Sequence, residues 1–94
     1  MYFVYVLRST KDAQLYVGYT TNLKQRVATH NKGSVLSTKS RRPWRLVFAE
    51  LYCDQKDALR REKYFKTTAG KNALRHMLRS TLKTSGMEST ACFS

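Results

Sequence analysis

Five side chains of this 94-residue chain could together transfer protons, bind a phosphate and hold a divalent cation. They are two phenols, a guanidinium, an imidazole and a carboxylate: Tyr5, Tyr16, Arg26, His30 and Glu62. Proteins use such groups as general acids and bases, as anion ligands and as metal ligands. These five side chains can act together only if the helices and strands that carry them bring them close in space.

Both tyrosines lie in short apolar runs that predict β-strands. Tyr5 is in the run FVYVL at positions 3–7, and Tyr16 opens the run YVG at positions 16–18. A hairpin that pairs position 5 with position 16 would point both phenols to one face, whereas a shift by one residue would separate them. The sequence leaves this register open, and each tyrosine alone is also an ordinary strand residue.

Arg26 and His30 fall one turn apart on a predicted helix. With Leu23 and Val27 they occupy positions i, i+3, i+4 and i+7, so this stripe should face the sheet. A buried guanidinium needs a partner, and no acidic residue occurs in segment 13–49. Arg26 therefore meets a carboxylate from elsewhere in the chain or a phosphate in a cleft, or it extends its head to water, and His30 is either catalytic or a hydrogen-bonded histidine at the rim.

Glu62 is the one acid on the apolar stripe of a second predicted helix. The stripe consists of Ala58, Leu59, Glu62 and Phe65. A half-buried carboxylate requires a cation, which could be Lys66 one turn on, Arg26, or a metal ion. Mg²⁺ often takes only one or two protein carboxylates and keeps its waters and substrate phosphates, so a single acid is enough to consider it.

The elements expected around these residues give an α+β fold in one domain, residues 1–83, in the order β-β-α-β-α-α. A three-stranded antiparallel sheet is flanked by helices. Strands are expected at 2–7, 14–19 and 44–52, and helices at about 23–33, 55–66 and 71–82. A break is expected at Thr67 to Gly70, a polar loop at 34–43 and a disordered tail at 84–94.

Composition points to a polyanionic partner. The formal charge is +12, from 18 basic against 6 acidic residues, and a hydrophobic content of 41% argues against wholesale disorder. Nucleic acid is favoured over a membrane surface, because no long amphipathic helix carries a bulky aromatic face. Cys53 and Cys92 form neither a disulfide framework nor a metal pattern, and no signal peptide is visible, so a cytoplasmic location is expected.

Several basic residues cluster around the five candidates. Those expected to contact a nucleic-acid backbone are Lys24, Lys39, Arg41, Arg42, Arg45, Arg61 and Lys63. The alternative is an ordinary solvated surface, which the scarcity of acids in the same segments makes less attractive.

At these spacings the chain resembles the GIY-YIG nuclease superfamily, above all its small single-domain bacterial members, and is similar to the nuclease domain found in bacterial excision-repair endonucleases. Residues 3–5 (FVY) stand where Gly-Ile-Tyr belongs, and residues 16–18 (YVG) where Tyr-Ile-Gly belongs. Arg26 and His30 match the Arg-x-x-x-His of the first helix. Glu62 stands where the metal-binding Glu is expected. One departure is a phenylalanine in place of the first glycine, where the backbone is less permissive.

The resemblance implies a metal-dependent endonuclease that hydrolyses phosphodiester bonds in DNA with one Mg²⁺ or Mn²⁺ ion, in repair or recombination. It implies that Tyr16 is the general base or positions the attacking water, and that Tyr5 holds the water shell or the phosphate. It further implies that Arg26 stabilises the phosphoryl oxygens, His30 orients or deprotonates the nucleophile, and Glu62 anchors the metal.

Two other functions fit the same composition. One is a non-catalytic nucleic-acid-binding module of the same fold, and the other is a basic accessory protein for RNA or a protein assembly. The complete set of five residues argues against the first, because binding alone gains nothing from a carboxylate that faces phosphates. DNA is preferred over RNA as the partner. A protein partner could supply specificity, and the oligomeric state is left open.

Overall fold

The computed structural model describes residues 1–83, and its elements follow the expected order with two additional short helices. The strands are β1 (Tyr2–Ser9), β2 (Leu15–Thr20) and β3 (Trp44–Tyr52). The helices are α1 (Leu23–Lys32), α2 (Leu36–Lys39), α3 (Gln55–Phe65), α4 (Thr68–Met77) and α5 (Arg79–Lys83). None of these helices is long and apolar enough to cross a membrane. The tail expected at 84–94 lies outside the described residues.

The three strands form one antiparallel sheet in the order β2-β1-β3, which confirms the predicted α+β class. The central strand is β1, whose residues 4–7 are all buried. Because both faces of this strand are buried, its sequence is a continuous apolar run rather than an alternation of apolar and polar residues. A register shift between Val6 and Leu7 interrupts its pairing with β3.

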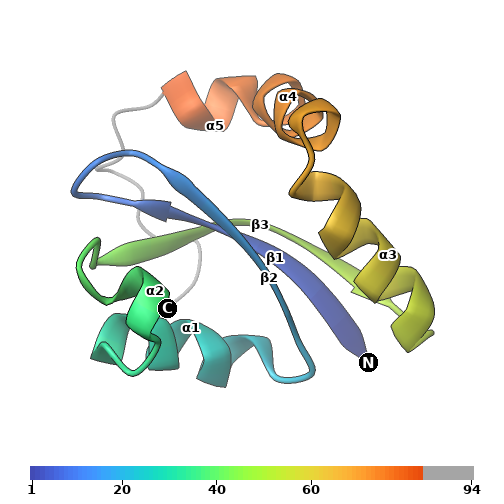
Figure 1. The fold of residues 1–94 in the computed structure, drawn as a ribbon, viewed down its shortest axis with the longest axis horizontal. Helices are drawn as coiled ribbons and strands as arrows, with labels where there is room; N and C mark the ends of the chain where they lie inside the picture. The colour runs from blue at the N-terminus through green and yellow to red at the C-terminus, as the bar shows by residue number, and fades with distance from the viewer. Residues whose placement is uncertain (84–94) are drawn as a thin grey trace.

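Helices cover both faces of this sheet (Figure 1). On one face, α3 and α4 pack on the valines of β1, in a main core of Val4, Val6, Val17, Ala58, Phe65, Leu74 and Leu78. On the other face, α1 packs Leu23 and Val27 against a smaller cluster of Tyr5, Leu7 and Trp44. Because side chains alternate along a strand, β1 contributes to both clusters and sends Tyr5 toward α1.

Two predicted boundaries were wrong. The loop expected at 34–43 contains the short helix α2, and the helix expected at 71–82 begins earlier and is divided at Leu78. The hydroxyl of Thr67 accepts a hydrogen bond from the backbone N–H of Gly70 at 3.0 Å, so the predicted break is in fact the N-cap and first turn of α4. Leu78 is 7% exposed and leaves helical geometry to enter the main core.

The buried face of α3 differs from the predicted stripe at one position. Ala58 and Phe65 are fully buried, but Leu59 is 41% exposed. Arg61, three residues after Ala58, lies on the buried side in its place and stacks its guanidinium 4.3 Å from the ring centroid of Phe65. A long cationic side chain can cover apolar surface in this way while its charged head finds a partner.

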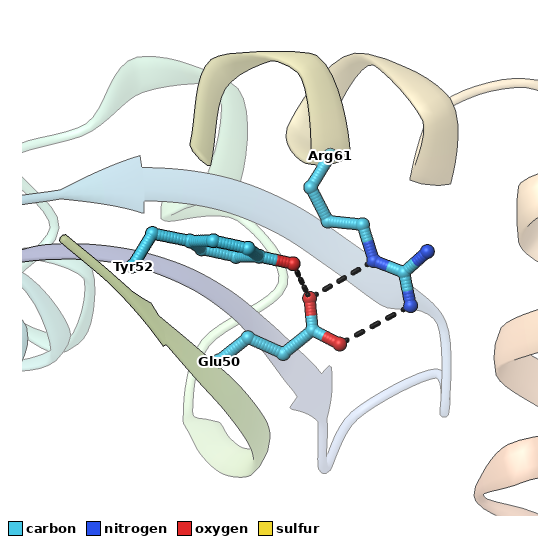
Figure 2. A network of polar contacts seen from close by, with 3 residues as sticks. All are labelled: Glu50, Tyr52 and Arg61. Carbon is cyan, nitrogen blue, oxygen red and sulfur yellow. Dashed lines mark hydrogen bonds and ion pairs between the residues drawn. The ribbon is translucent and has the colours of Figure 1, made fainter. Parts of the chain in front are cut away.

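That partner is the carboxylate of Glu50 on β3 (Figure 2). Arg61 donates from Nε to Oε1 at 2.9 Å and from Nη2 to Oε2 at 3.2 Å. The hydroxyl of Tyr52 donates to the same Oε1 at 2.7 Å, and burial, followed by this hydrogen bond, raises the pKa of Tyr52. This β3–α3 clamp of Glu50, Tyr52 and Arg61 fixes the position of α3 on the sheet, because a bidentate pair constrains both distance and rotation.

The contact between α3 and α4 depends on the absence of a side chain at Gly70. A Cβ at this position would collide with the backbone carbonyl oxygen of Tyr64 and would lie 2.7 Å from the Cα of Phe65. These are backbone atoms, which cannot move aside as a flexible side chain can. Gly70 therefore sets how closely α4 approaches the end of α3.

We expect Gly70→Ala to lower the free energy of unfolding by about 1–3 kcal/mol, the usual cost of overpacking, despite the better helix propensity of alanine. Asn72→Ala, at an exposed position of the same helix, is the matched control and should change stability by less than about 0.5 kcal/mol. Urea denaturation measures both. An unchanged midpoint for Gly70→Ala would mean that the helices can separate without cost.

Candidate active site

The two motif tyrosines share one face of the sheet. Tyr5 pairs with Gly18, and Tyr16 pairs with Leu7, so the pairing of 5 with 16 that the sequence allows is not the one formed. The actual register differs from it by two residues and keeps both phenols on the α1 side, because side chains alternate with period two. Their ring centroids lie 6.4 Å apart.

Gly18 makes room for the first of these phenols. A Cβ on Gly18 would overlap the hydroxyl and Cζ of Tyr5, its partner across the strands. The ring of Tyr5 therefore lies directly over the glycine backbone. The glycine of the YVG motif is required here for close approach rather than for an unusual backbone angle.

Helix α1 brings Arg26 and His30 to the tyrosines. Its N-cap is Asn22, whose side chain accepts a hydrogen bond from the N–H of Gln25. Near its other end, Asn31 makes two hydrogen bonds with the backbone of Trp44: the N–H of Trp44 donates to Oδ1 at 2.6 Å, and Nδ2 donates to the carbonyl at 3.0 Å. The stripe predicted from the sequence does face the sheet, and α1 is anchored to β3.

A chain of hydrogen bonds runs through Tyr5 and His30. Arg26 Nε donates to the Tyr5 hydroxyl at 3.3 Å, and that hydroxyl lies 2.8 Å from His30 Nε2. His30 Nδ1 lies 2.9 Å from the hydroxyl of Thr38, which itself donates to the carbonyl of Val35 at 3.3 Å.

This arrangement assigns the protons. The Thr38 hydroxyl donates onward, so it accepts from His30 Nδ1–H, and the unprotonated Nε2 then accepts from Tyr5 O–H. Every donor in the chain has an acceptor when His30 is neutral. Thr38 was not among the predicted site residues, because a threonine in a polar segment without apolar periodicity carries no local signal.

Burial sets the protonation states. His30 is 0% exposed, and desolvation together with the charge of Arg26 lowers its pKa to about 4. Burial also raises the pKa of Tyr5, which outweighs the opposite effect of its hydrogen bond with Arg26. The same hydrogen bond raises the pKa of Arg26. At neutral pH the site therefore contains a neutral imidazole, a protonated Tyr5 and a charged guanidinium.

Glu62 reaches this group from α3. Its carboxylate is 3.2 Å from the ammonium of Lys66, the i,i+4 pair considered from the sequence, and the Glu62 side chain is 22% exposed. Lys66 Nζ in turn lies 5.9 Å from the ring centroid of Tyr16. The charge of Glu62 also raises the pKa of Tyr5, although burial and the interactions with Arg26 and Tyr16 have larger effects. The acid thus lies at the border of the tyrosine face.

The donor set fits a hard cation with few protein ligands. Within residues 1–83 there is no group of three or more His, Cys, Asp or Glu side chains that could hold a metal ion, so a closed structural site of the zinc type does not fit. The pairing of Glu62 with an ammonium shows that a positive charge can sit against its carboxylate. Mg²⁺ or Mn²⁺, bound by one carboxylate, waters and substrate phosphate, fits these residues.

The basic residues predicted for backbone contacts are not equivalent. Lys24, Lys39 and Lys63 are exposed, whereas Arg42 and Arg45 are half-buried. Arg41 stacks 5.3 Å from the ring of Trp44, which orients it at the edge of the tyrosine face. Arg61 belongs to the β3–α3 clamp, so its guanidinium is engaged with Glu50 and is not presented to a phosphate.

We expect Gly18→Ala to destabilise the protein by about 1–3 kcal/mol, because the methyl group displaces the Tyr5 ring. The control is a double-mutant cycle with Tyr5→Leu, which removes the atoms that the methyl group meets. Urea denaturation of the four proteins should then give a cost for Gly18→Ala that is smaller in the Tyr5→Leu background. Equal costs in both backgrounds would contradict the close approach.

The pKa of His30 predicts a pH dependence of stability. Its value falls from 6.5 in the unfolded chain to about 4 in the folded one, so the unfolded state binds more protons between these values. The contribution is fully present above pH 6.5 and is lost as the pH falls toward 4, to a total of roughly 3 kcal/mol.

Unfolding free energies of wild type and His30→Gln measured across this range should therefore converge as the pH is lowered. Carboxylates that titrate in the same range affect both proteins alike, so the difference isolates His30. A difference that stays constant with pH would show that His30 titrates normally.

Known proteins are similar to this chain over most of its length. A family model described as the GIY-YIG catalytic domain matches residues 1–75, which include all five candidate residues. A UPF0213 protein of Staphylococcus haemolyticus is 43% identical over 75 residues, which cover 79% of this chain and 90% of that protein. A UPF0213 protein of Bacillus licheniformis is 39% identical over 77 residues, which cover 81% and 78% respectively.

A solved structure is also similar. The solution NMR structure of a UPF0213 protein from Bacillus halodurans has a TM-score of 0.55 and 29% sequence identity, and the match covers 97% of this chain and all of that one. The sheet, helices α1 to α3 and the ordered set of motif residues occur within the stretch that the family model spans. The chain belongs to the GIY-YIG family.

Proposed function

We propose that the protein is an endonuclease that hydrolyses phosphodiester bonds in DNA with one Mg²⁺ or Mn²⁺ ion. The observation that carries this proposal is that Tyr5, Tyr16 and Arg26 meet on the α1 side of the sheet, while the half-buried Glu62 on α3 contacts Lys66, whose ammonium lies 5.9 Å from the ring centroid of Tyr16. A strongly basic chain suits a polyanionic substrate, and membership of a nuclease family supports the same reaction.

Arg26 is the group best placed to receive the scissile phosphate. Its Nε donates to the Tyr5 hydroxyl, and a side-chain hydrogen bond with Tyr16 also contributes to its raised pKa, so both motif phenols hold the guanidinium that would contact phosphoryl oxygens. A preorganised arginine stabilises the charge that develops on these oxygens and is worth about 10³-fold or more in comparable phosphoryl transfers. Tyr5 keeps its proton at neutral pH and positions Arg26.

Tyr16 is the remaining phenol and takes the role of general base, or orients the attacking water. As a base, Tyr16 would first give its own proton to solvent, and its phenolate oxygen would take a proton from the water as that water attacks phosphorus; the bond to the leaving oxygen breaks, and that oxygen takes a proton from solvent. His30 is fully buried and bonded at both ring nitrogens, so we assign it the task of holding Tyr5 rather than contact with the nucleophile.

Glu62 would hold the divalent ion. When bound, that ion polarises a phosphoryl oxygen and stabilises the leaving oxygen. The β3–α3 clamp positions the residue next to Glu62 in the sequence, and so fixes the helix that presents the carboxylate.

One observation favours a non-catalytic nucleic-acid-binding module of the same fold. Glu62 already has an internal cation in Lys66, so its burial does not by itself require a metal. The two functions differ in whether DNA is cleaved once a divalent ion is supplied. Repair or recombination is the pathway that we infer for the active form.

We expect purified protein to nick supercoiled plasmid in the presence of Mg²⁺ or Mn²⁺, and Glu62→Gln to lower the rate by about 100-fold or more while DNA binding is retained. The reason is that the variant keeps the shape of the side chain but loses the charge that attracts the ion. Asp57→Asn, an exposed acid on the same helix, is the control and should cleave normally. Equal nicking by wild type and Glu62→Gln would contradict the role given to Glu62, whereas no nicking by wild type with either metal on DNA or RNA would favour the binding module.

A further inference from the structure

A cleft of about 500 Å³ opens at the outer edge of the sheet, between the β1–β2 hairpin and α4. Its polar walls are formed by Arg8, Gln14, Tyr16, Lys66, Lys71 and Arg75. We call it the cationic cleft, because four of these side chains are basic and the described residues that line it include no Asp or Glu. The mechanism proposed above uses only Tyr16 of this set.

The cations of α4 are held in the cleft by the packing of the helix. Lys71 and Arg75 are one turn apart and flank Leu74, which is 1% exposed and anchors this side of α4 in the main core. Both side chains are exposed, so an incoming anion can reach them without unfolding the helix. The apolar part of the wall comes from Leu15, Val17, Leu74 and Leu82.

The cleft is continuous with the candidate active site. Tyr16 lines the cleft while its ring lies 6.4 Å from that of Tyr5, and Lys66 lines it while its ammonium contacts Glu62. Of these two residues, Tyr16 lies in β2 and Lys66 is the C-cap of α3. Within the described residues, β2 is an edge strand of the sheet. A polymer bound at Arg26 can therefore pass around this edge into the cleft.

We propose that the cationic cleft binds a backbone phosphate of the nucleic-acid substrate, on one side of the phosphate held by Arg26. Lys71 and Arg75 contact the non-bridging oxygens, and the apolar wall accommodates the sugar. Lysine and arginine at such a site position the strand without reading its sequence. This inference rests on the proposed function, since it names where the substrate of that site continues.

The test compares two charge-matched double variants. Lys71→Ala with Arg75→Ala removes two cations from the cleft, and Lys56→Ala with Arg60→Ala removes two exposed cations from α3 outside it. Binding of a fluorescein-labelled 20-nucleotide DNA, single-stranded and duplex, is followed by anisotropy in EDTA over a range of NaCl concentrations. Both pairs change the net charge equally.

We expect the cleft pair to reduce the magnitude of the slope of log K against log[salt] by about 1–2. The reason is that a protein with fewer phosphate contacts releases fewer counterions from DNA when it binds. The control pair should leave the slope within about 0.5 of wild type. Equal slopes for the two pairs would overturn the proposal. Thermal denaturation checks that the cleft pair is folded, and Lys71→Gln with Arg75→Gln replaces it if it is not.

Two further measurements separate the possible failures. If the cleft pair lowers the affinity for inorganic phosphate, measured by ³¹P NMR titration, but not for DNA, the cleft takes a free anion and the proposal is wrong. Plasmid nicking is scored independently. If the cleft pair has a reduced salt slope but wild type does not nick plasmid, the phosphate-binding role of the cleft stands and the endonuclease proposal is wrong. If wild type nicks plasmid but the cleft pair has an unchanged slope, the endonuclease proposal stands and the role of the cleft is wrong.

Discussion

The candidate site depends on a hydroxyl and an imidazole that are removed from water together. Tyr5 is 1% exposed and His30 is not exposed, so each must find its hydrogen-bond partner within the protein. Their mutual bond, at 2.8 Å, meets this need only when β1 and α1 are docked, and the far side of the imidazole needs Thr38 of α2. One buried pair thereby couples three elements, and its geometry delivers Arg26 to the tyrosine face.

The positive charge of the chain is used in two different ways. Arg61 and Lys66 are neutralised by Glu50 and Glu62, and the first of these pairs holds α3 against β3. By contrast, no Asp or Glu lines the cationic cleft beside Lys71 and Arg75 among the described residues, and no acid occurs in segment 13–49, which contains α1 and α2. Pairing inside the fold thus supplies rigidity, while the remaining charge favours a polyanionic partner around the same edge of the sheet.

Much of this arrangement was predictable, because local patterns carried it. The apolar run of β1, the stripe that includes Arg26 and His30, and the strand from Trp44 to Tyr52 each appear where periodicity predicts them. The errors have local causes as well. Thr67 is predicted to lie in a break although its hydroxyl caps α4, and Leu59 is predicted to be inside although Arg61, with a distant acid for a partner, occupies that side.

By itself the sequence determined the fold class, the family pattern and the identity of the five candidate residues, since these follow from spacing and residue type. Only the tertiary structure decided the roles that depend on contacts between distant segments. The hairpin register and the fit of Tyr5 over Gly18 depend on how two strands pair, and the Thr38 partner of His30 depends on how α2 docks on α1. Such contacts arise from packing, and packing is a property of the whole fold rather than of any one segment.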